Sequence, residues 1–552
     1  MAAALLPLYQ FRPGRDSSLA QLRCDVLGTA LVQVGDGNPG ALADPNHETL
    51  RLSRRAQQMP SAGRRWGRQF EQQLLADVFY VQGSAEVFRL CERHMNSATD
   101  IGMASSDEFR ILSPTAILGY GFPVESLRRG LGRERHAIAV DAGSVDPGPF
   151  YLGAGKPFVS RSATLRDLAL LLPAARERDI PLIIGTAGGA GAKPHVDWTL
   201  EILDQVARDH GMTVDVGVIY TDVEAQRVAQ ALAADEIAAL DHAPALDEDS
   251  LAATERIVAQ IGCPPVARAL RRGFQVIVCG RAYDPAVFAA PAMVAGYPDA
   301  AALHMGKILE CAAIAADPGS GRDCVLGTVD ADGFTLETLS PARSFTDYSV
   351  AAHALYEKSD PYHLPGPEGT LDLTDVRYEA LSGGRVRVTG SRLQPPARPC
   401  VKLEGARREG YRSLFIAGIR DPRFIRQLDD VIDSISSDVR AEHPALRIAA
   451  HVYGRDGVMG SREPNRNPGH EVGLVLEVLA ETQEAADAGC GMLRSTLLHF
   501  GYPGRIATAG NLALPFSPSD ISCGPCYTFS LYHLLDMELE QTAFEAVARR
   551  IG

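Results

Sequence analysis

The chain has 552 residues, of which 46% are hydrophobic, 22% are charged and 7% are aromatic. We expect two or three domains, because single hydrophobic cores stop growing beyond roughly 250–300 residues. The 54 Lys and Arg residues are outnumbered by 68 Asp and Glu residues, so the net charge of −14 argues against a broad nucleic-acid-binding surface. No stretch approaches the roughly 20 apolar residues of a membrane-spanning helix, and the first residues lack the features of a signal peptide. We therefore expect a cytoplasmic protein that binds neither nucleic acid nor membrane.

Residues 1–94 differ in composition from the rest of the chain. They contain eleven arginines and no lysine, and turn-forming clusters stand at residues 35–40 and 43–47. No repeating strand–helix unit occurs there, so we predict an atypical and poorly ordered N-terminal extension. Residues 1–94 have two possible interpretations. They form a true N-terminal module, or translation begins at Met95.

Residues 95–325 have the pattern of an α/β domain. From Phe109 onward, apolar runs of four to six residues are each followed by a turn and an amphipathic helix. This order is typical of βαβ units and predicts a doubly wound, mostly parallel sheet. The expected strands are 109–112, 136–141, 181–185, 214–220, 236–240 and 274–279, and the helices between them include 165–178, 196–210 and 224–234.

Residues 326–552 are predicted to form a smaller α+β domain that ends in a C-terminal segment. Two short alternating strands, 375–379 and 384–390, are separated by a Gly-Gly turn and predict an antiparallel hairpin. The other expected elements are a helix at 422–442, strands at 446–453 and 471–479, and a helix at 482–499.

The first candidate site is the loop that begins at Asp141, at the end of a predicted strand. Ligands of open α/β sheets bind where strands end, since helix N-termini and loops converge there. Asp141, Ser144 and Asp146 place two carboxylates and a hydroxyl in this loop. Two carboxylates can bind a divalent cation or divide acid and base roles. The structural alternative is that both are turn formers and helix caps.

The second candidate site is a glycine-rich loop between a strand and a helix. Its four glycines let backbone amides surround an anion, such as a phosphate, a carboxylate or a coenzyme A pyrophosphate, and a lysine can add charge. The alternative is a tight connection in which Asp197 or His195 caps the helix. Neither a Walker pattern nor a dinucleotide pattern is present. The candidate anion-binding residues are Gly185, Thr186, Gly188, Gly189, Gly191, Lys193 and His195.

Three further places supply charged candidates. Asp222 follows one predicted strand, and Arg281 and Asp284 follow another. The Arg281 guanidinium can hold a substrate carboxylate, or it can form an ion pair with Asp284 that holds the loop together. Glu310 falls on an apolar helix, where a carboxylate is costly unless it has a partner. Its neighbour Cys311 is expected to serve packing rather than to act as a nucleophile.

The cysteines and the metal-binding patterns give a weaker signal. Most of the ten cysteines stand singly in apolar runs and are expected to be buried thiols. Cys523 and Cys526 have the spacing of a redox pair, but turn-forming residues precede them instead of an apolar strand. His451 lies near an arginine and an aspartate and can contribute to an interdomain site or a salt bridge. No His-Glu-x-x-His pattern and no Gly-x-Ser-x-Gly pattern occurs.

Six segments of the chain have a pattern in common with one known family, and they are 280–286, 290–293, 309–311, 350–361, 371–379 and 507–521. Together they resemble the acyclic terpene utilisation protein A family. The resemblance covers roughly residues 109–480, together with the tail. It implies a metabolic enzyme in a pathway that degrades branched acids through coenzyme A thioesters, and it extends to Arg281, Asp284 and Glu310. The glycine-rich loop departs from the family pattern, so a terpene substrate is not implied.

Together these features predict an enzyme that acts on a carboxylic acid or acyl-CoA intermediate, as a lyase or hydro-lyase. Asp141, Asp222, Asp284 or Glu310 would transfer a proton, and the glycine-rich loop and Arg281 would bind the anionic groups. A divalent cation or a coenzyme A thioester substrate would fit these residues, and a homo-oligomer is expected. The alternatives are a non-catalytic subunit that binds small molecules and a thiol-redox protein.

Overall fold

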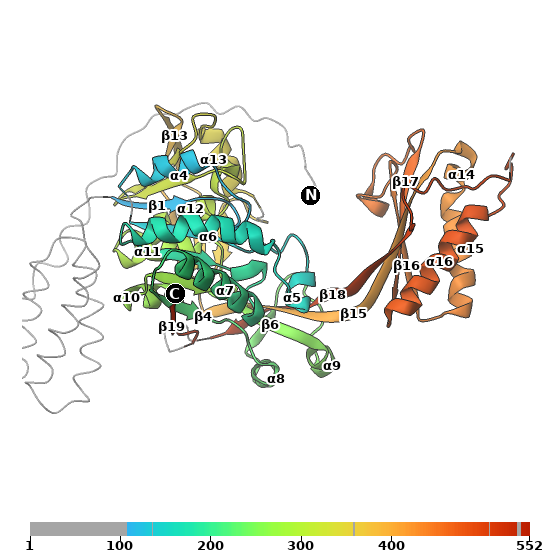
Figure 1. The fold of residues 1–552 in the computed structure, drawn as a ribbon, viewed down its shortest axis with the longest axis horizontal. Helices are drawn as coiled ribbons and strands as arrows, with labels where there is room; N and C mark the ends of the chain where they lie inside the picture. The colour runs from blue at the N-terminus through green and yellow to red at the C-terminus, as the bar shows by residue number, and fades with distance from the viewer. Residues whose placement is uncertain (1–107, 135, 357–358, 507, 538–542) are drawn as a thin grey trace, which may run out of the picture. The chain divides into compact units, whose positions relative to one another are not determined.

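The computed structural model describes residues 108–134, 136–356, 359–506, 508–537 and 543–552 (Figure 1). The predicted extension at residues 1–94 and the alternative start at Met95 lie outside these residues. No helix in the described ranges is long and apolar enough to cross a membrane. The sheets and helices below confirm a mixed α/β protein.

Ten of the described strands form one mixed sheet, sheet A. In spatial order they are β12 (Arg377–Leu381), β13 (Arg385–Thr389), β9 (Gly333–Thr338), β8 (Val325–Val329), β1 (Phe109–Ser113), β2 (Ala137–Asp141), β3 (Leu182–Gly185), β7 (Val276–Cys279), β4 (Val214–Ile219) and β19 (Val547–Ile551). The five strands from β1 to β4 in this order are parallel. The strands on either side of them are antiparallel.

The central strands of sheet A are buried on both faces. Every residue of β2, β3 and β7 is buried, as expected for parallel strands that are covered on two sides. Side chains alternate across a strand, so neighbouring residues enter two separate hydrophobic cores. Ala139 and Ile183 belong to one core, and Ile138 and Ile184 belong to the other. The doubly wound arrangement of the helices on this sheet stays a prediction.

Sheet A continues past the boundary that we predicted near residue 325. The strands β8, β9, β13 and β12 pair in series onto β1, and the C-terminal strand β19 pairs with β4. The hairpin predicted from the Gly-Gly turn is confirmed as β12 and β13, but it lies within sheet A. The short strands β12 and β13, in which polar and apolar residues alternate, therefore extend sheet A instead of starting a separate sheet.

Six strands form a second, antiparallel sheet, sheet B. They are β16 (Arg447–Tyr453), β17 (Val472–Ala480), β15 (Cys400–Ile419), β18 (Asp520–Asp536), β5 (Ile237–Ala239) and β6 (Thr254–Gln260). The run at 236–240 was predicted in the parallel sheet, and this prediction was wrong because β5 pairs antiparallel with β18. β5 has three residues, two of them exposed, so it lacks the apolar length of a central parallel strand.

The longest strand, β15, runs beside β18 and joins two cores (Figure 1). Val401 and Leu403, near its start, pack with Leu531 in one core. Phe415 and Ala417, near its end, pack in another core together with helices of the C-terminal part. Register shifts between β15 and β18 accompany this length and mark bulges in the strand pair.

Helices cover both sheets. Helices α10, α11 and α12 contribute to the core that contains Ala139, and α6 and α7 contribute to the core that contains Ile138. The helix predicted at 422–442 is divided at Gln427 into α14 and α15. The helices are α4 (Val124–Leu131), α5 (Phe150–Ala154), α6 (Arg161–Arg176), α7 (Lys193–Asp209), α8 (Ala225–Ala233), α9 (Glu248–Ala252), α10 (Cys263–Arg271), α11 (Ala286–Val294), α12 (Asp299–Leu309), α13 (Asp347–Ala354), α14 (Pro422–Arg426), α15 (Leu428–Glu442) and α16 (Gln483–His499).

The remaining elements are short. A small antiparallel sheet contains β10 (His363–Gly366), β11 (Gly369–Asp372) and β14 (Arg392–Gln394). Three 3₁₀ turns in the described ranges are η1 (Ala187–Gly189), η2 (Ala312–Ala315) and η3 (Gly460–Arg462). Of these, η1 lies in the glycine-rich loop and positions part of the candidate site.

Candidate functional site

The candidate site lies where the parallel strands of sheet A end. Asp141 is the last residue of β2, and it stands beside Gly185, the last residue of β3. Arg281 follows β7, which pairs with β3 in the same direction. The carboxyl ends of these strands therefore bring three of the predicted loops to one edge of the sheet, as expected for an open α/β sheet.

Arg281 is the centre of a group of polar side chains that are buried, apart from the partly exposed Asp284. Its side chain is only 4% exposed, and Nε donates to Glu404 Oε2 at 3.0 Å. Its Nη1 donates to Asp284 Oδ1 at 2.9 Å and to Thr186 Oγ1 at 3.3 Å. We name Asp141, Thr186, Arg281, Asp284 and Glu404 the Arg281 cluster. The Arg281–Asp284 pair corresponds to the loop-holding alternative considered for these residues.

Glu404 belongs to β15 and was not among the predicted site residues. Both Arg281 and Lys402 bind its carboxylate, with Lys402 Nζ 2.7 Å from Oε1. These two cations overcome the effect of burial and hold the pKa of Glu404 at about 2. Charged and apolar side chains alternate at Lys402, Leu403 and Glu404. This alternation indicates a strand, but nothing in the sequence indicates that Glu404 contacts Arg281.

The buried carboxylate of Asp141 has one oxygen without a hydrogen-bond partner. The side chain is buried, and no hydrogen-bond partner of Oδ1 is found among the described residues. Burial raises the pKa of Asp141 well above its usual range, and the charges of Asp284 and Glu310 raise it further against the opposing effect of Arg281. A β-carbon on Gly185 would stand 3.0 Å from Asp141 Oδ1, so the glycine leaves room for this oxygen.

The glycine-rich loop approaches the Arg281 cluster through its backbone. Thr186 has a φ of 38°, a left-handed conformation that is costly for a β-branched residue. Its hydroxyl group accepts from Ala282 N at 3.2 Å, in addition to its bond with Arg281. A β-carbon on Gly191 would clash with Arg281 N, so only glycine allows this close approach. Such strain is concentrated at functional sites in proteins.

Glu310 and Lys307 form a second buried ion pair beside the cluster. The helix α12 ends at Leu309, whose carbonyl accepts from Ser113 Oγ, at the end of β1, at 2.7 Å. Lys307 Nζ lies 2.6 Å from Glu310 Oε1, and the two side chains are 4% and 6% exposed. Burial and the charge of Lys307 lower the pKa of His353 to about 4, so this histidine is neutral at physiological pH. Glu310 was predicted as a site residue from the sequence, but its ion-pair partner Lys307 was not.

Lys193 and Asp222 lie at the N-terminus of α7. Asp222 Oδ1 accepts from Lys193 N at 3.0 Å, so a carboxylate of the chain itself binds the first turn of the helix. Lys193 Nζ lies 2.5 Å from Asp197 Oδ2, and Tyr220 Oη donates to Asp197 Oδ1 at 2.6 Å. We name Lys193, Asp197, Tyr220 and Asp222 the α7 group. Asp222, rather than Asp197 or His195, thus caps the helix.

The remaining predicted residues have structural partners. His195 is buried, and its Nε2 is 3.0 Å from Lys156 O and 3.1 Å from Tyr151 O. Ser144 Oγ accepts from Asp146 N at 3.1 Å in a turn, and Asp146 is exposed. Gly188 and Gly189 have positive φ values of 64° and 107° and turn the chain into the helix.

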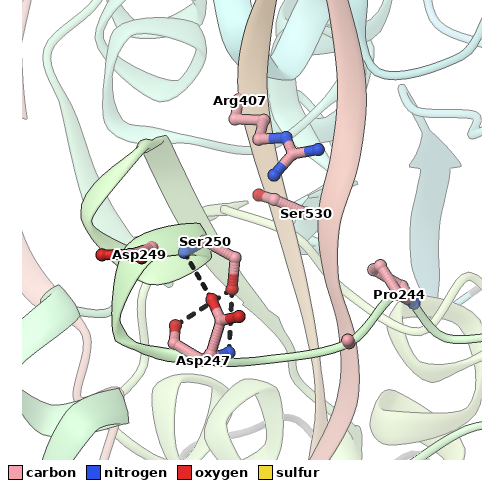
Figure 2. Close-up of a pocket in the computed structure, with 7 residues that line it drawn as sticks. Pro244, Asp247, Asp249, Ser250, Arg407 and Ser530 are labelled. Atoms are coloured by element: carbon pink, nitrogen blue, oxygen red, sulfur yellow. Dashed lines mark hydrogen bonds between the residues drawn. The ribbon is translucent and has the colours of Figure 1, made fainter.

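Two hollows lie elsewhere on the described surface. One is formed by α9 and the β15–β18 strand pair, and Figure 2 shows Asp247 bound to Ser250 opposite Arg407. The second hollow lies beside the loop that follows Asp141. Neither is lined by a member of the Arg281 cluster.

Metal and thiol chemistry receive little support from the described residues. No group of three or more His, Cys, Asp or Glu residues there could hold a metal ion. Cys523 is exposed and Cys526 is buried on the same strand, β18, and both are free thiols. Partial burial raises the pKa of Cys523, whereas redox-active cysteines have a lowered pKa.

Comparison with known proteins identifies the family. The family model of acyclic terpene utilisation family protein AtuA matches residues 161–322 and 327–514. The chain belongs to this family. The matched ranges of this AtuA family member contain Thr186, Arg281, Asp284 and Glu404, whereas Asp141 precedes them. Comparisons with curated proteins and with solved structures gave no match.

Proposed function

We propose that the chain is an enzyme that moves a proton at Asp141 while it converts a small carboxylic acid or acyl thioester, as a lyase or hydro-lyase does. The observation that carries this proposal is the buried Asp141 Oδ1, which has no partner among the described residues at the edge where the parallel strands end. A buried polar atom without a partner costs about 1–3 kcal/mol. A ligand that binds this oxygen would remove the cost.

The raised pKa of Asp141 favours the role of a general acid. A raised pKa means that the carboxyl group keeps its proton to a higher pH than usual, and a protonated carboxyl group can donate to a leaving group. In the loss of water from a hydroxy acid, a carbon-bound proton and the neighbouring hydroxyl group leave together. Asp141 would protonate the leaving hydroxyl group, and Asp284 or Glu310 would accept the carbon-bound proton.

Arg281 would orient the substrate. Its Nε and Nη2 are directed at Glu404, whereas Nη1 binds Asp284, whose side chain is 32% exposed. A substrate carboxylate that replaced Asp284 would accept from Nη1 and keep the charge of Arg281 compensated on both sides, while Nε and Nη2 stay directed at Glu404.

Membership of the AtuA family supports a metabolic role in general terms. Binding of a coenzyme A thioester or another anion by the glycine-rich loop with Lys193, a cytoplasmic location and a homo-oligomeric state belong to the proposal as well. The alternative, a subunit that binds small molecules without converting them, would use the same residues but would release no product.

The test compares Asp141→Asn with Asp146→Asn, a matched change in the exposed part of the same loop. Hydroxy acids and acyl-CoA thioesters that raise the melting temperature would be incubated with each protein, and products that differ by one water would be sought by mass spectrometry. We expect Asp141→Asn to lower turnover about 10²–10⁴-fold and Asp146→Asn to leave it unchanged. Unchanged turnover in Asp141→Asn would refute the role of Asp141, and binding without product in the wild type would favour the non-catalytic alternative.

A further inference from the structure

The hollow beside the Asp141 loop has the size of a small-molecule site. Its volume is about 410 Å³, and small-ligand pockets range over roughly 300–1,000 Å³. It is lined by Val145, Asp241, His242, Pro244, Phe529 and Tyr532.

The lining favours an uncharged, apolar occupant. The rings of Phe529 and Tyr532 stand 6.0 Å apart at 56°, and Val145 is 39% exposed although it is apolar. Apolar surface of this kind is stabilised when a ligand removes it from water. The exposed carboxylate of Asp241 lies at the same hollow and would repel an anion.

A chain of polar contacts joins this hollow to the Arg281 cluster. Lys402 Nζ donates to Tyr532 Oη at 3.4 Å and stands 4.8 Å from the centre of the Tyr532 ring. The same ammonium group lies 2.7 Å from Glu404, and Glu404 binds Arg281. Tyr532 therefore lines the hollow, and Lys402 connects its hydroxyl group to Glu404 of the cluster.

The other wall of the hollow is tied to Asp141 through the backbone. Val145 is the fourth residue after Asp141, and Ser144 N in the same loop donates to Gly189 O at 3.3 Å. Opposite it, Leu240 N donates to Tyr532 O at 3.4 Å, which holds the segment of Asp241 beside the ring. The hollow and the cluster thus share the loop that follows β2, and Tyr532 on β18 is the register partner of Glu404 on β15.

We infer that this hollow binds the uncharged apolar part of the substrate, while the carboxyl or thioester end of the substrate reaches the Arg281 cluster. The binding of the carboxyl or thioester end by the Arg281 cluster rests on the proposed function. The hollow is then the part of the protein that selects substrates by chain length. The occupant is an alkyl or acyl chain rather than an anion, a nucleotide or a protein.

The experiment measures binding of butanoate, hexanoate and octanoate to the full-length chain by isothermal titration calorimetry. Because the hollow buries methylene groups, we expect affinity to rise with chain length, by up to about fourfold for each methylene buried. Val145→Trp fills the hollow and is expected to abolish this dependence. Val124→Trp is the matched control, since Val124 is 42% exposed on α4, away from the hollow, and it is expected to keep the dependence.

Two further variants keep the inference testable if Val145→Trp does not fold. Phe529→Ala removes an apolar wall and is expected to reduce the gain from butanoate to octanoate, whereas Tyr532→Phe keeps the ring and is expected to retain it. Affinity in the wild type that does not rise with chain length, including no binding of any of the three acids, would overturn the inference. A dependence that survives in both Val145→Trp and Phe529→Ala would do the same.

The test of the hollow is independent of the test of the proposed function, because it measures the affinity for acids of different chain length and needs no turnover. Asp141→Asn leaves the hollow intact and is expected to keep the dependence on chain length. If that variant retains full turnover while Val145→Trp loses the dependence, the catalytic role of Asp141 fails and the hollow stands as the binding site.

Discussion

The Arg281 cluster and the α7 group contain the same kinds of residues, but water reaches them to very different extents. In the cluster, the side chains of Arg281 and Glu404 are each 4% exposed. In the α7 group, Lys193 is 59% exposed and Asp197 is 39% exposed. Members of both groups follow parallel strands of sheet A, whereas Glu404 of the cluster belongs to β15 of sheet B. Burial, and not residue type, therefore distinguishes the region that we propose as a reaction site from a solvated helix terminus.

This difference has an energetic consequence. An ion pair that is exposed to water contributes little to the stability of the folded protein, because solvent screens both charges and the side chains lose conformational entropy when they are held together. A buried pair is costly to assemble but even more costly to break, because the remaining charge has no substitute partner. The cluster can therefore hold a guanidinium and a strained threonine in fixed positions, as an active site requires.

The largest expected effect is on stability when the buried pair is broken. Glu404→Gln removes the charge that faces Arg281 Nε and leaves a buried guanidinium with only part of its compensation. We expect the free energy of unfolding to fall by about 3–5 kcal/mol, measured by urea denaturation at neutral pH.

Asp197→Asn provides the control for this measurement, because it removes the partner of an exposed lysine. Its effect should stay within about 1 kcal/mol. Equal losses in the two variants would show that burial does not separate the two groups, and the comparison would fail.

A smaller effect is expected in the pH dependence of stability. Asp141 has a raised pKa in the folded chain, so above pH of about 4 the unfolded state releases this proton while the folded state keeps it. The stability contributed by protonated Asp141 is therefore present at low pH and is lost as pH rises through the folded pKa. One group changes the free energy of unfolding by at most about 1.4 kcal/mol per pH unit.

Asp141→Asn isolates this contribution, because all other groups titrate in both proteins. We expect the stability of the variant, relative to the wild type, to increase as pH rises above about 4 in parallel urea titrations, until Asp141 ionises in the folded chain. A difference that does not change over this range would mean that Asp141 ionises normally, and its assignment as a general acid would be withdrawn.

The parts of the site that follow strands could be predicted from the sequence, since turns after apolar runs mark the edge where parallel strands end. Asp141, Thr186, Arg281 and Asp284 were found in this way and lie together. Glu404 could not be found, because it is 123 residues from Arg281 in the chain and only the fold of β15 brings them into contact. The role of Asp222 was missed for the same reason, since a helix cap from a neighbouring strand leaves no local signal.

The sheet showed the same limit at a larger scale. The five parallel strands of sheet A were recognised from their apolar runs, and the β12–β13 hairpin from its Gly-Gly turn. The strands β8, β9 and β19 were not predicted. The pairing of β8 with β1 and of β19 with β4 was not predicted either, because it depends on contacts between distant segments. Alternation in a strand indicates one exposed face, and it does not say which sheet the strand joins.

The smallest expected effect concerns Lys193, and it sharpens the comparison from the exposed side. Lys193→Met removes a charge whose partner, Asp197, is also partly exposed, so the free energy of unfolding should change by no more than about 1 kcal/mol, and less at high salt. The stability change does not test whether Lys193 binds an anion.

Binding of coenzyme A, measured by titration calorimetry, tests this role of Lys193. The carboxylate of Asp222 already binds the first turn of α7, so an incoming phosphate group would compete with it. If Lys193→Met weakens coenzyme A binding tenfold or more while leaving stability unchanged, the α7 group is an anion site that opens when a ligand displaces Asp222. If affinity is unaffected, the lysine belongs to the solvated surface, and the thioester end of the substrate is recognised by the Arg281 cluster alone.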